Sequence, residues 1–226
     1  MLLLPFALSL SVVISAALLL WALATQRRSL AYLFKPLTTT LIIVLAITAP
    51  APVAEGYRWL VVGGLLFGLA GDIFLMLPRD AFLAGLVSFL VGHLLYIAAF
   101  VQRGGAQITP WLMGLYLVPP AVLLAWLRPH VGKMLAPVVL YALVLTAMGW
   151  RASEMWLVTA DLPAILATVG SLLFLVSDSV LAVERFLPGA VGGQRDRLVL
   201  STYFGGQLLI AWSIIGLGAL ASLPGA

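Results

Sequence analysis

The stretch LLPFALSLSVVISAALLLWALAT, residues 3–25, contains no charged side chain. A helix needs about 20 consecutive apolar residues to cross the hydrocarbon core of a bilayer, so this stretch predicts a transmembrane helix. It is longer than the apolar core of a signal peptide and no basic residue precedes it. We therefore expect it to be a helix of the folded protein.

Seven further stretches share this character and are separated by short segments rich in Pro, Gly and charged residues. Together with the first, the predicted spans are residues 3–25, 35–51, 57–77, 81–102, 109–127, 133–151, 160–183 and 197–221. The second span is the shortest, and its opening Lys35-Pro36 suits the first turn of a helix. The sequence therefore predicts an all-α fold, a polytopic integral membrane bundle of about eight transmembrane helices.

The composition supports a single lipid-embedded unit. Hydrophobic residues make up 63% of the chain and charged residues 9%, whereas an ordinary soluble domain has about 25% charged residues. So few charges cannot cover a water-exposed surface, so most of the outside must face lipid. No polar linker divides the chain, and we expect residues 1–226 to form one transmembrane domain.

The twelve Lys and Arg residues are divided unevenly between the two sides of the predicted bundle. Nine lie at one side, and the other three, Arg58, Arg103 and Arg151, lie at the side of the termini. The positive-inside rule assigns the richer side to the cytoplasm, as in a bacterial inner membrane protein with both termini on the non-cytoplasmic side. The basic residues form no continuous stripe, so no nucleic-acid partner is expected.

Two of the predicted helices contain similar motifs. Residues 64–72 read GLLFGLAGD and residues 170–178 read GSLLFLVSD, so each motif has a Gly eight residues before an Asp. Both helices run toward the predicted cytoplasmic side, which gives the two aspartates the same depth. The pattern is compatible with a parallel repeat of four plus four helices, and equally with chance agreement between two short apolar segments.

Ionisable residues inside the spans are the first candidates for function, because each costs roughly 2.5–3.5 kcal/mol at a helix centre. Asp72 and Asp178 lie near the predicted cytoplasmic ends of their helices, at about the depth of Lys35, Tyr203 and Gln207. This shared depth predicts a polar pocket that opens toward the cytoplasmic leaflet. Two neighbouring carboxylates in a medium of low dielectric repel each other, so one is expected to keep its proton at neutral pH, which sets an acid beside a base.

Structural interpretations compete with this one. The two aspartates could be buried charges paired with Lys35 or with backbone groups, and Lys35 itself could be a snorkelling anchor at the interface. His93, with Tyr96 one turn later, and Tyr141 could equally pack and hydrogen-bond between helices. The chain has no cysteine and only two histidines, so a three-histidine zinc site is excluded, and we expect no metal.

Six motifs, in order along the predicted helices, carry a resemblance to a known family. They are Phe34-Lys35-Pro36-Leu37, Leu69-Ala70-Gly71-Asp72, the run from Phe89 to Tyr96, Tyr141-Ala142 with Met148-Gly149, the run from Gly170 to Ser179, and the run from Tyr203 to Ile210. With these motifs the chain resembles the YhhN/TMEM86 family of membrane proteins, whose characterised members are lysoplasmalogenases.

The resemblance implies a membrane hydrolase that cleaves the vinyl ether of a lysoplasmalogen to a fatty aldehyde and glycerophospho-ethanolamine or -choline. It implies two essential aspartates, which fall on Asp72 and Asp178, and no cofactor. The substrate would be a lysophospholipid in the membrane, with binding roles open to the other polar residues of the spans. These candidates are Lys35, His93, Tyr96, Tyr141, Tyr203 and Gln207.

Two other classes of protein fit the same residues. Paired intramembrane aspartates, a central histidine and a four-helix repeat are also typical of a small proton-coupled transporter. A lipid-binding membrane protein without catalytic activity is a third interpretation. Release of fatty aldehyde separates the enzyme from both, because neither a transporter nor a lipid-binding protein releases it.

Overall fold

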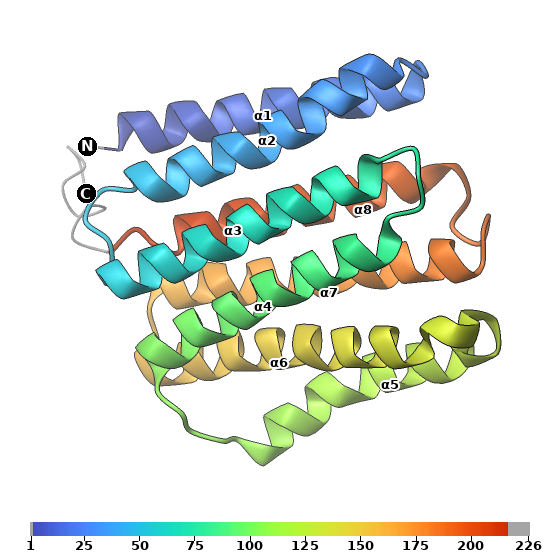
Figure 1. Ribbon diagram of the computed structural model, residues 1–226. Coiled ribbons are helices and arrows are strands. Elements are labelled where there is room, and N and C mark those ends of the chain that lie inside the picture. Colours follow the sequence, from blue (N-terminus) through green and yellow to red (C-terminus); the bar gives the residue numbers. More distant parts are fainter. Residues whose placement is uncertain (1, 217–226) are drawn as a thin grey trace.

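A computed structural model describes residues 2–216 of the protein, and these residues confirm the all-α class (Figure 1). The eight α-helices are α1 (Leu3–Ala24), α2 (Arg28–Thr48), α3 (Glu55–Met76), α4 (Phe82–Gly104), α5 (Pro110–Val131), α6 (Leu135–Thr159), α7 (Leu162–Phe186) and α8 (Arg195–Trp212). Short 3-10 turns precede two of them, Gly132–Met134 before α6 and Gly192–Gln194 before α8.

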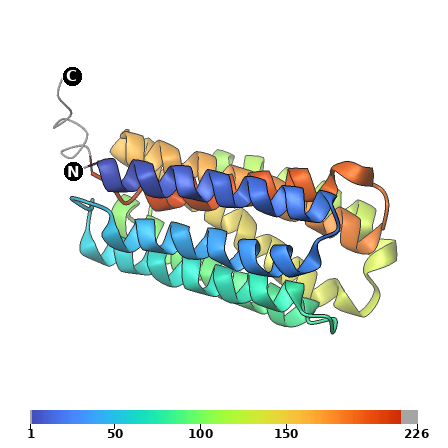
Figure 2. The same ribbon diagram turned by 90° about the horizontal axis from the view of Figure 1, so that it is seen from above.

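The helices lie side by side and alternate in direction along the chain (Figures 1 and 2). The α1–α2, α3–α4, α5–α6 and α7–α8 connections lie at one end, and the start of α1 and the end of α8 lie at the other. Helix α3 packs along α4, and α7 packs along α8. Helix α5 lies at the edge of the bundle, against α6 and α7 (Figure 1).

Six stretches of the described chain are long and apolar enough to cross a membrane. They are α1, α2, α3, α4, α7 and the continuous stretch Pro110–Thr159, which contains both α5 and α6. Large apolar side chains cover the outside of the bundle, including Val122, which is 65% exposed, and Leu115, which is 62% exposed. Helix α8 has 18 residues and opens with Arg195-Asp196-Arg197, so the count of eight spanning helices stays a prediction.

Helix α2 begins earlier than the predicted span of residues 35–51. It starts at Arg28, so Lys35 and Pro36 lie in the helix interior and the first-turn assignment of Pro36 was wrong. The low hydropathy of Arg27 and Arg28 predicts a connection between helices at these residues. Arginine is nevertheless a good helix former, so α2 can begin there. The earlier start adds about two turns at the end of the bundle where the connections lie.

The α5 and α7 helices end three to four residues later than predicted, and the ends of α6 and α8 differ more. Helix α6 continues to Thr159, past the predicted end at residue 151, because buried Arg151 pairs with Glu154 within the helix. The Arg151 guanidinium also donates to the backbone carbonyl of Gln107, with an N–O distance of 2.5 Å. Helix α8 ends at Trp212, and the predicted residues 217–221 lie outside the described part of the chain.

The first glycine of each repeated motif lies at a close helix crossing. A Cβ on Gly92 of α4 would lie 2.9 Å from the carbonyl oxygen of Gly64 in α3. A Cβ on Gly206 of α8 would lie 2.7 Å from the carbonyl oxygen of Gly170 in α7. Small residues at such crossings let two backbones approach closely. The two crossings are compatible with the parallel repeat, which stays a prediction.

Substitution of Gly206 by alanine is expected to lower the melting temperature, because the new methyl group would collide with the Gly170 carbonyl. Overpacking of this kind typically costs about 1–3 kcal/mol. Gly205→Ala is the matched control, since its Cβ would meet only Leu173 at an ordinary 3.4 Å. Thermal unfolding of both variants in detergent measures the difference, and equal melting temperatures would contradict the close crossing.

Candidate active site

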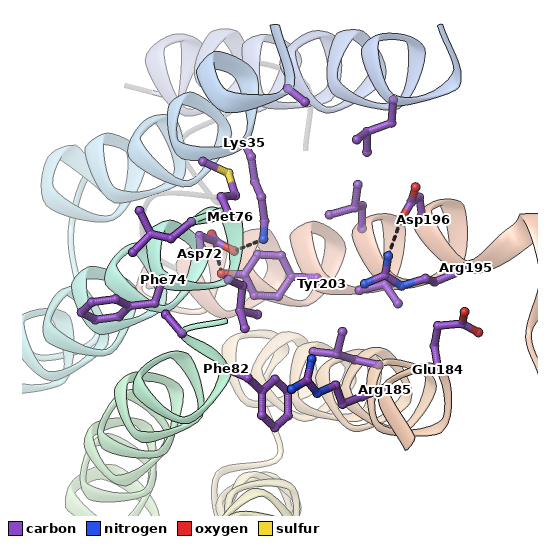
Figure 3. Close-up of a pocket in the computed structure, with 18 of the residues that line it drawn as sticks. Lys35, Asp72, Phe74, Met76, Phe82, Glu184, Arg185, Arg195, Asp196 and Tyr203 are labelled. Carbon is purple, nitrogen blue, oxygen red and sulfur yellow. Dashed lines mark hydrogen bonds and ion pairs between the residues drawn. The ribbon is translucent and has the colours of Figure 1, made fainter. Parts of the chain in front are cut away.

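A cavity of about 790 Å³ opens at the end of the bundle where the helix connections lie (Figure 3). Residues of the α3–α4 connection and Pro188 of the α7–α8 connection line its mouth. Asp72 of α3 and Asp178 of α7 both line the cavity, together with Lys35 and Tyr203. The structure thus brings together the two aspartates that the sequence placed at equal depth.

Asp72 is surrounded by hydrogen-bond donors and a cation. Its side chain is 2% exposed, and its Oδ1 lies 3.1 Å from the Lys35 ammonium. Its Oδ2 accepts hydrogen bonds from the hydroxyls of Thr39 at 2.7 Å and Tyr203 at 2.8 Å. Figure 3 shows Lys35 extending from α2 to Asp72 beside the Tyr203 ring. The Asp72 carboxyl group thus has one cationic partner and two neutral hydrogen-bond donors.

A chain of hydrogen bonds continues from Asp72 into the core. The Gln207 amide donates to the Tyr203 hydroxyl at 3.0 Å, and the Tyr96 hydroxyl donates to the Gln207 carbonyl oxygen at 2.7 Å. Gln207 is fully buried and Tyr96 is 1% exposed. The structure therefore links α3, α8 and α4 through the polar residues that the sequence analysis singled out.

Asp178 has a different environment. It is partly buried, and its carboxylate accepts a hydrogen bond from the Tyr141 hydroxyl of α6. None of the ion pairs formed within residues 2–216 includes Asp178. Among the residues that the structure describes, one carboxyl group in the cavity thus has a cationic partner, and the other has a single neutral donor.

His93 lies beside the rings of Tyr96 and Tyr141, which belong to the hydrogen-bonded groups around the two aspartates. Its side chain is buried, and neither ring nitrogen has a hydrogen-bond partner within the described residues. The ring packs edge-on against Phe174, with centroids 4.8 Å apart, and lies 5.4 Å from the Tyr141 ring. His93 therefore contacts the site by packing.

Thr39 is a residue of the site that the sequence analysis did not identify. It donates to Asp72 from the same helix as Lys35. Its signal in the sequence is weak, because threonine is common in apolar helices, where its hydroxyl can bond to a backbone carbonyl four residues earlier. The neighbouring Thr40 does so, to the Pro36 carbonyl at 2.8 Å.

Charged residues of both signs line the mouth of the cavity. They are Arg28, Arg79, Asp80, Glu184, Arg185, Arg195 and Asp196. The Arg185 guanidinium donates to Asp80 at 2.6 Å, so the α3–α4 connection is tied to the end of α7. This hydrogen bond, together with one from the Phe82 backbone N–H, lowers the pKa of the Asp80 carboxyl below its usual value. Asp80 therefore stays ionised at neutral pH.

Three relatives illustrate what the chain is similar to. A human protein named lysoplasmalogenase TMEM86B is 34% identical over 169 residues, which cover 71% of this chain and 65% of that protein. An Escherichia coli O6:H1 protein named uncharacterized membrane protein YhhN is 30% identical over 183 residues, covering 81% of this chain and 86% of that one. A Mycobacterium tuberculosis protein named lysoplasmalogenase is 35% identical over 156 residues, covering 65% and 58%.

The chain thus spans slightly less than two thirds of the human relative, somewhat more than half of the mycobacterial relative and most of the E. coli protein. No solved structure matches it significantly. The sequence model of the YhhN family matches residues 30–214, which include the cavity-lining helices apart from α1 and the first two residues of α2. With its apolar helices and these membrane-protein relatives, the chain is an integral membrane protein that belongs to the YhhN family.

Proposed function

We propose that this protein is a lysoplasmalogenase, which hydrolyses the vinyl ether bond of a lysoplasmalogen to a fatty aldehyde and a glycerophospho-ethanolamine or -choline. The observation that carries the proposal is the pair of unequal carboxyl groups, Asp72 and Asp178, in one cavity. The names of the human and mycobacterial relatives support the same activity. No cofactor is required for this chemistry.

Vinyl ether hydrolysis requires an acid and a stabilising anion. A proton adds to the outer alkene carbon, and the resulting cation is shared between the inner carbon and the ether oxygen. Water then adds to the inner carbon, and the hemiacetal collapses to an aldehyde and an alcohol. Glycosidases stabilise a similar oxocarbenium ion with a pair of carboxyl groups, one acting as an acid and the other as an anion.

Asp178 is the proton donor in this proposal. It has no cationic partner within the described chain, and a carboxyl group in low dielectric without one favours its neutral form. The Tyr141 hydroxyl, which bonds to its Oδ2, fixes the orientation of the group. The acid therefore faces the cavity in one position.

Asp72 is the anion that stabilises the oxocarbenium ion. Lys35, Thr39 and Tyr203 all favour its ionised form. It accepts a proton from the water that adds to the inner carbon, and it returns that proton to the departing glycerol oxygen. The hemiacetal hydroxyl gives its proton to Asp178, which restores the starting state with one water consumed.

The remaining polar residues support this pair. Gln207 and Tyr96 hold the Tyr203 hydroxyl in place, so they act on Asp72 through Tyr203. His93 packs against the Tyr141 ring and acts as a positioning residue for the acid. Lys35 is engaged by Asp72, so its part in binding the lipid phosphate is secondary to holding that carboxylate charged.

Replacement of either aspartate by asparagine is expected to reduce kcat/KM for lysoplasmenyl-ethanolamine by about 10²–10⁴-fold, because general acid–base groups contribute about that much. Purified Asp72→Asn and Asp178→Asn proteins are incubated with this lipid in detergent, and fatty aldehyde is measured. Glu55→Gln, on an exposed side chain at the opposite end of the bundle, is the matched control and should keep wild-type activity.

The saturated-ether analogue should give no aldehyde with any of these proteins. Aldehyde from the vinyl ether that persists in both aspartate variants would remove this site from the mechanism. A well-folded wild type that releases none would exclude the enzyme and favour the proton-coupled transporter.

Cleavage in D₂O is expected to place one deuterium on the carbon next to the aldehyde group, because the acid protonates the outer alkene carbon. Mass spectrometry of the aldehyde, trapped immediately as a hydrazone, measures the label. Undeuterated aldehyde incubated with the protein in D₂O controls for exchange after cleavage. Aldehyde without deuterium would contradict protonation at carbon.

The cavity is expected to open toward the cytoplasm, following the distribution of Lys and Arg. Because the chain has no cysteine, single cysteines can report the orientation. In intact bacteria, a membrane-impermeant maleimide should label Ala106→Cys in the α4–α5 connection. It should label Gly193→Cys in the α7–α8 connection only after permeabilisation. Both positions are exposed, and the reverse pattern would invert the assigned topology.

A further inference from the structure

A second, smaller pocket lies beside Asp178, outside the main cavity. It is formed by residues of α3, α4, α6 and α7 and has a volume of about 40 Å³. Asp178 and the Tyr141 hydroxyl are its polar groups, and its other lining residues are apolar. These are Leu75, Phe82, Leu86, Phe89, Val138, Leu181, Ala182 and Phe186.

The small pocket adjoins the main cavity. Asp178, Phe89 and Leu181 line both spaces, as do Leu75 and Phe82. Away from Asp178, the lining of the two spaces differs. The main cavity leads to the charged residues of its mouth, whereas the lining of the small pocket is apolar. Asp178 therefore lies where a charged compartment meets an apolar one.

The chemistry of the proposed reaction fixes how the substrate would lie across this boundary. The carbon that receives the proton is the second carbon of the alkenyl chain, so the acid must lie on the chain side of the ether oxygen. The cation and the glycerol lie on the other side, near the stabilising anion. With Asp178 as the acid and Asp72 as the anion, the chain extends past Asp178 and the head group extends toward the mouth.

From this geometry we infer that the saturated carbons that directly follow the alkene in the alkenyl chain bind in the apolar pocket between α4, α6 and α7. The inference rests on the proposed function and adds to it the direction of the lipid in the cavity. The pocket volume of about 40 Å³ is slightly larger than the roughly 30 Å³ that one water molecule occupies in the liquid, and a methylene group is of similar size to a water molecule. The pocket therefore has room for on the order of one or two methylene groups. Leu86, Ala182 and Phe186 are partly exposed, so the chain continues from the pocket into the surrounding lipid.

Ala182→Leu tests the inference by filling the pocket. The variant is compared on lysoplasmenyl-ethanolamines with 16-carbon and 2-carbon alkenyl chains, the shorter being a plain vinyl ether that has no carbon to place in the pocket. We expect the ratio of the two kcat/KM values, long over short, to fall at least about tenfold, because one methylene in an apolar pocket changes kcat/KM by about 10–200-fold. Ala84→Leu, which adds the same atoms at an exposed position of α4, should keep the wild-type ratio.

Leu86→Ala enlarges the same pocket and gives a change that a folding defect cannot imitate. It is expected to raise kcat/KM for a substrate with a methyl branch on the third chain carbon, relative to the unbranched one. An active wild type whose chain-length ratio is the same in Ala182→Leu, with no gain in Leu86→Ala, overturns this inference alone. A wild type that releases no aldehyde from any chain overturns the proposed function as well.

Discussion

The ion pair between Lys35 and Asp72 is the interaction on which the site depends. A carboxylate inside a membrane bundle is stable only with a cation and donors that replace its lost hydration. Lys35 supplies the charge, and Thr39 and Tyr203 occupy the other oxygen. The pair also joins α2 to α3, so the same contact that gives Asp72 a cationic partner holds α2 to the core.

Close helix crossings allow this polar cluster to be compact. Gly64 faces Gly92 between α3 and α4, and Gly170 faces Gly206 between α7 and α8, each at backbone contact. Side chains at these points would separate the helices and lengthen the hydrogen bonds that cross between them. The two close crossings thus help to keep short the hydrogen bonds that run from Asp72 through Tyr203 and Gln207 to Tyr96 and connect α3, α8 and α4.

Much of the fold and part of the site could be predicted from the sequence. Asp72 and Asp178 stand out because an ionisable group in an apolar helix is costly, and their depth follows from counting residues to the helix end. The pairing of Tyr96 with Gln207 could not be predicted, because it depends on how α4 and α8 face each other. The continuation of α6 past residue 151 was missed because hydropathy registers the charge of Arg151 but not its buried partner Glu154.

The end of the bundle opposite the cavity is closed by ion pairs. Arg151 and Glu154 pair with each other and bind the segment after α4, where the Thr109 backbone N–H donates to Glu154. Arg103 at the end of α4 pairs with Asp161. Regions held by several buried ion pairs and hydrogen bonds unfold locally only at a high free energy, whereas regions with few such contacts unfold locally at a lower one. Among residues 2–216, these ion pairs lie at the end of the bundle opposite the charged mouth of the main cavity. In the proposed reaction, the water-soluble product leaves through this mouth and the alkenyl chain lies toward the lipid, so the two products separate in different directions and release of the head group is a step that can limit turnover.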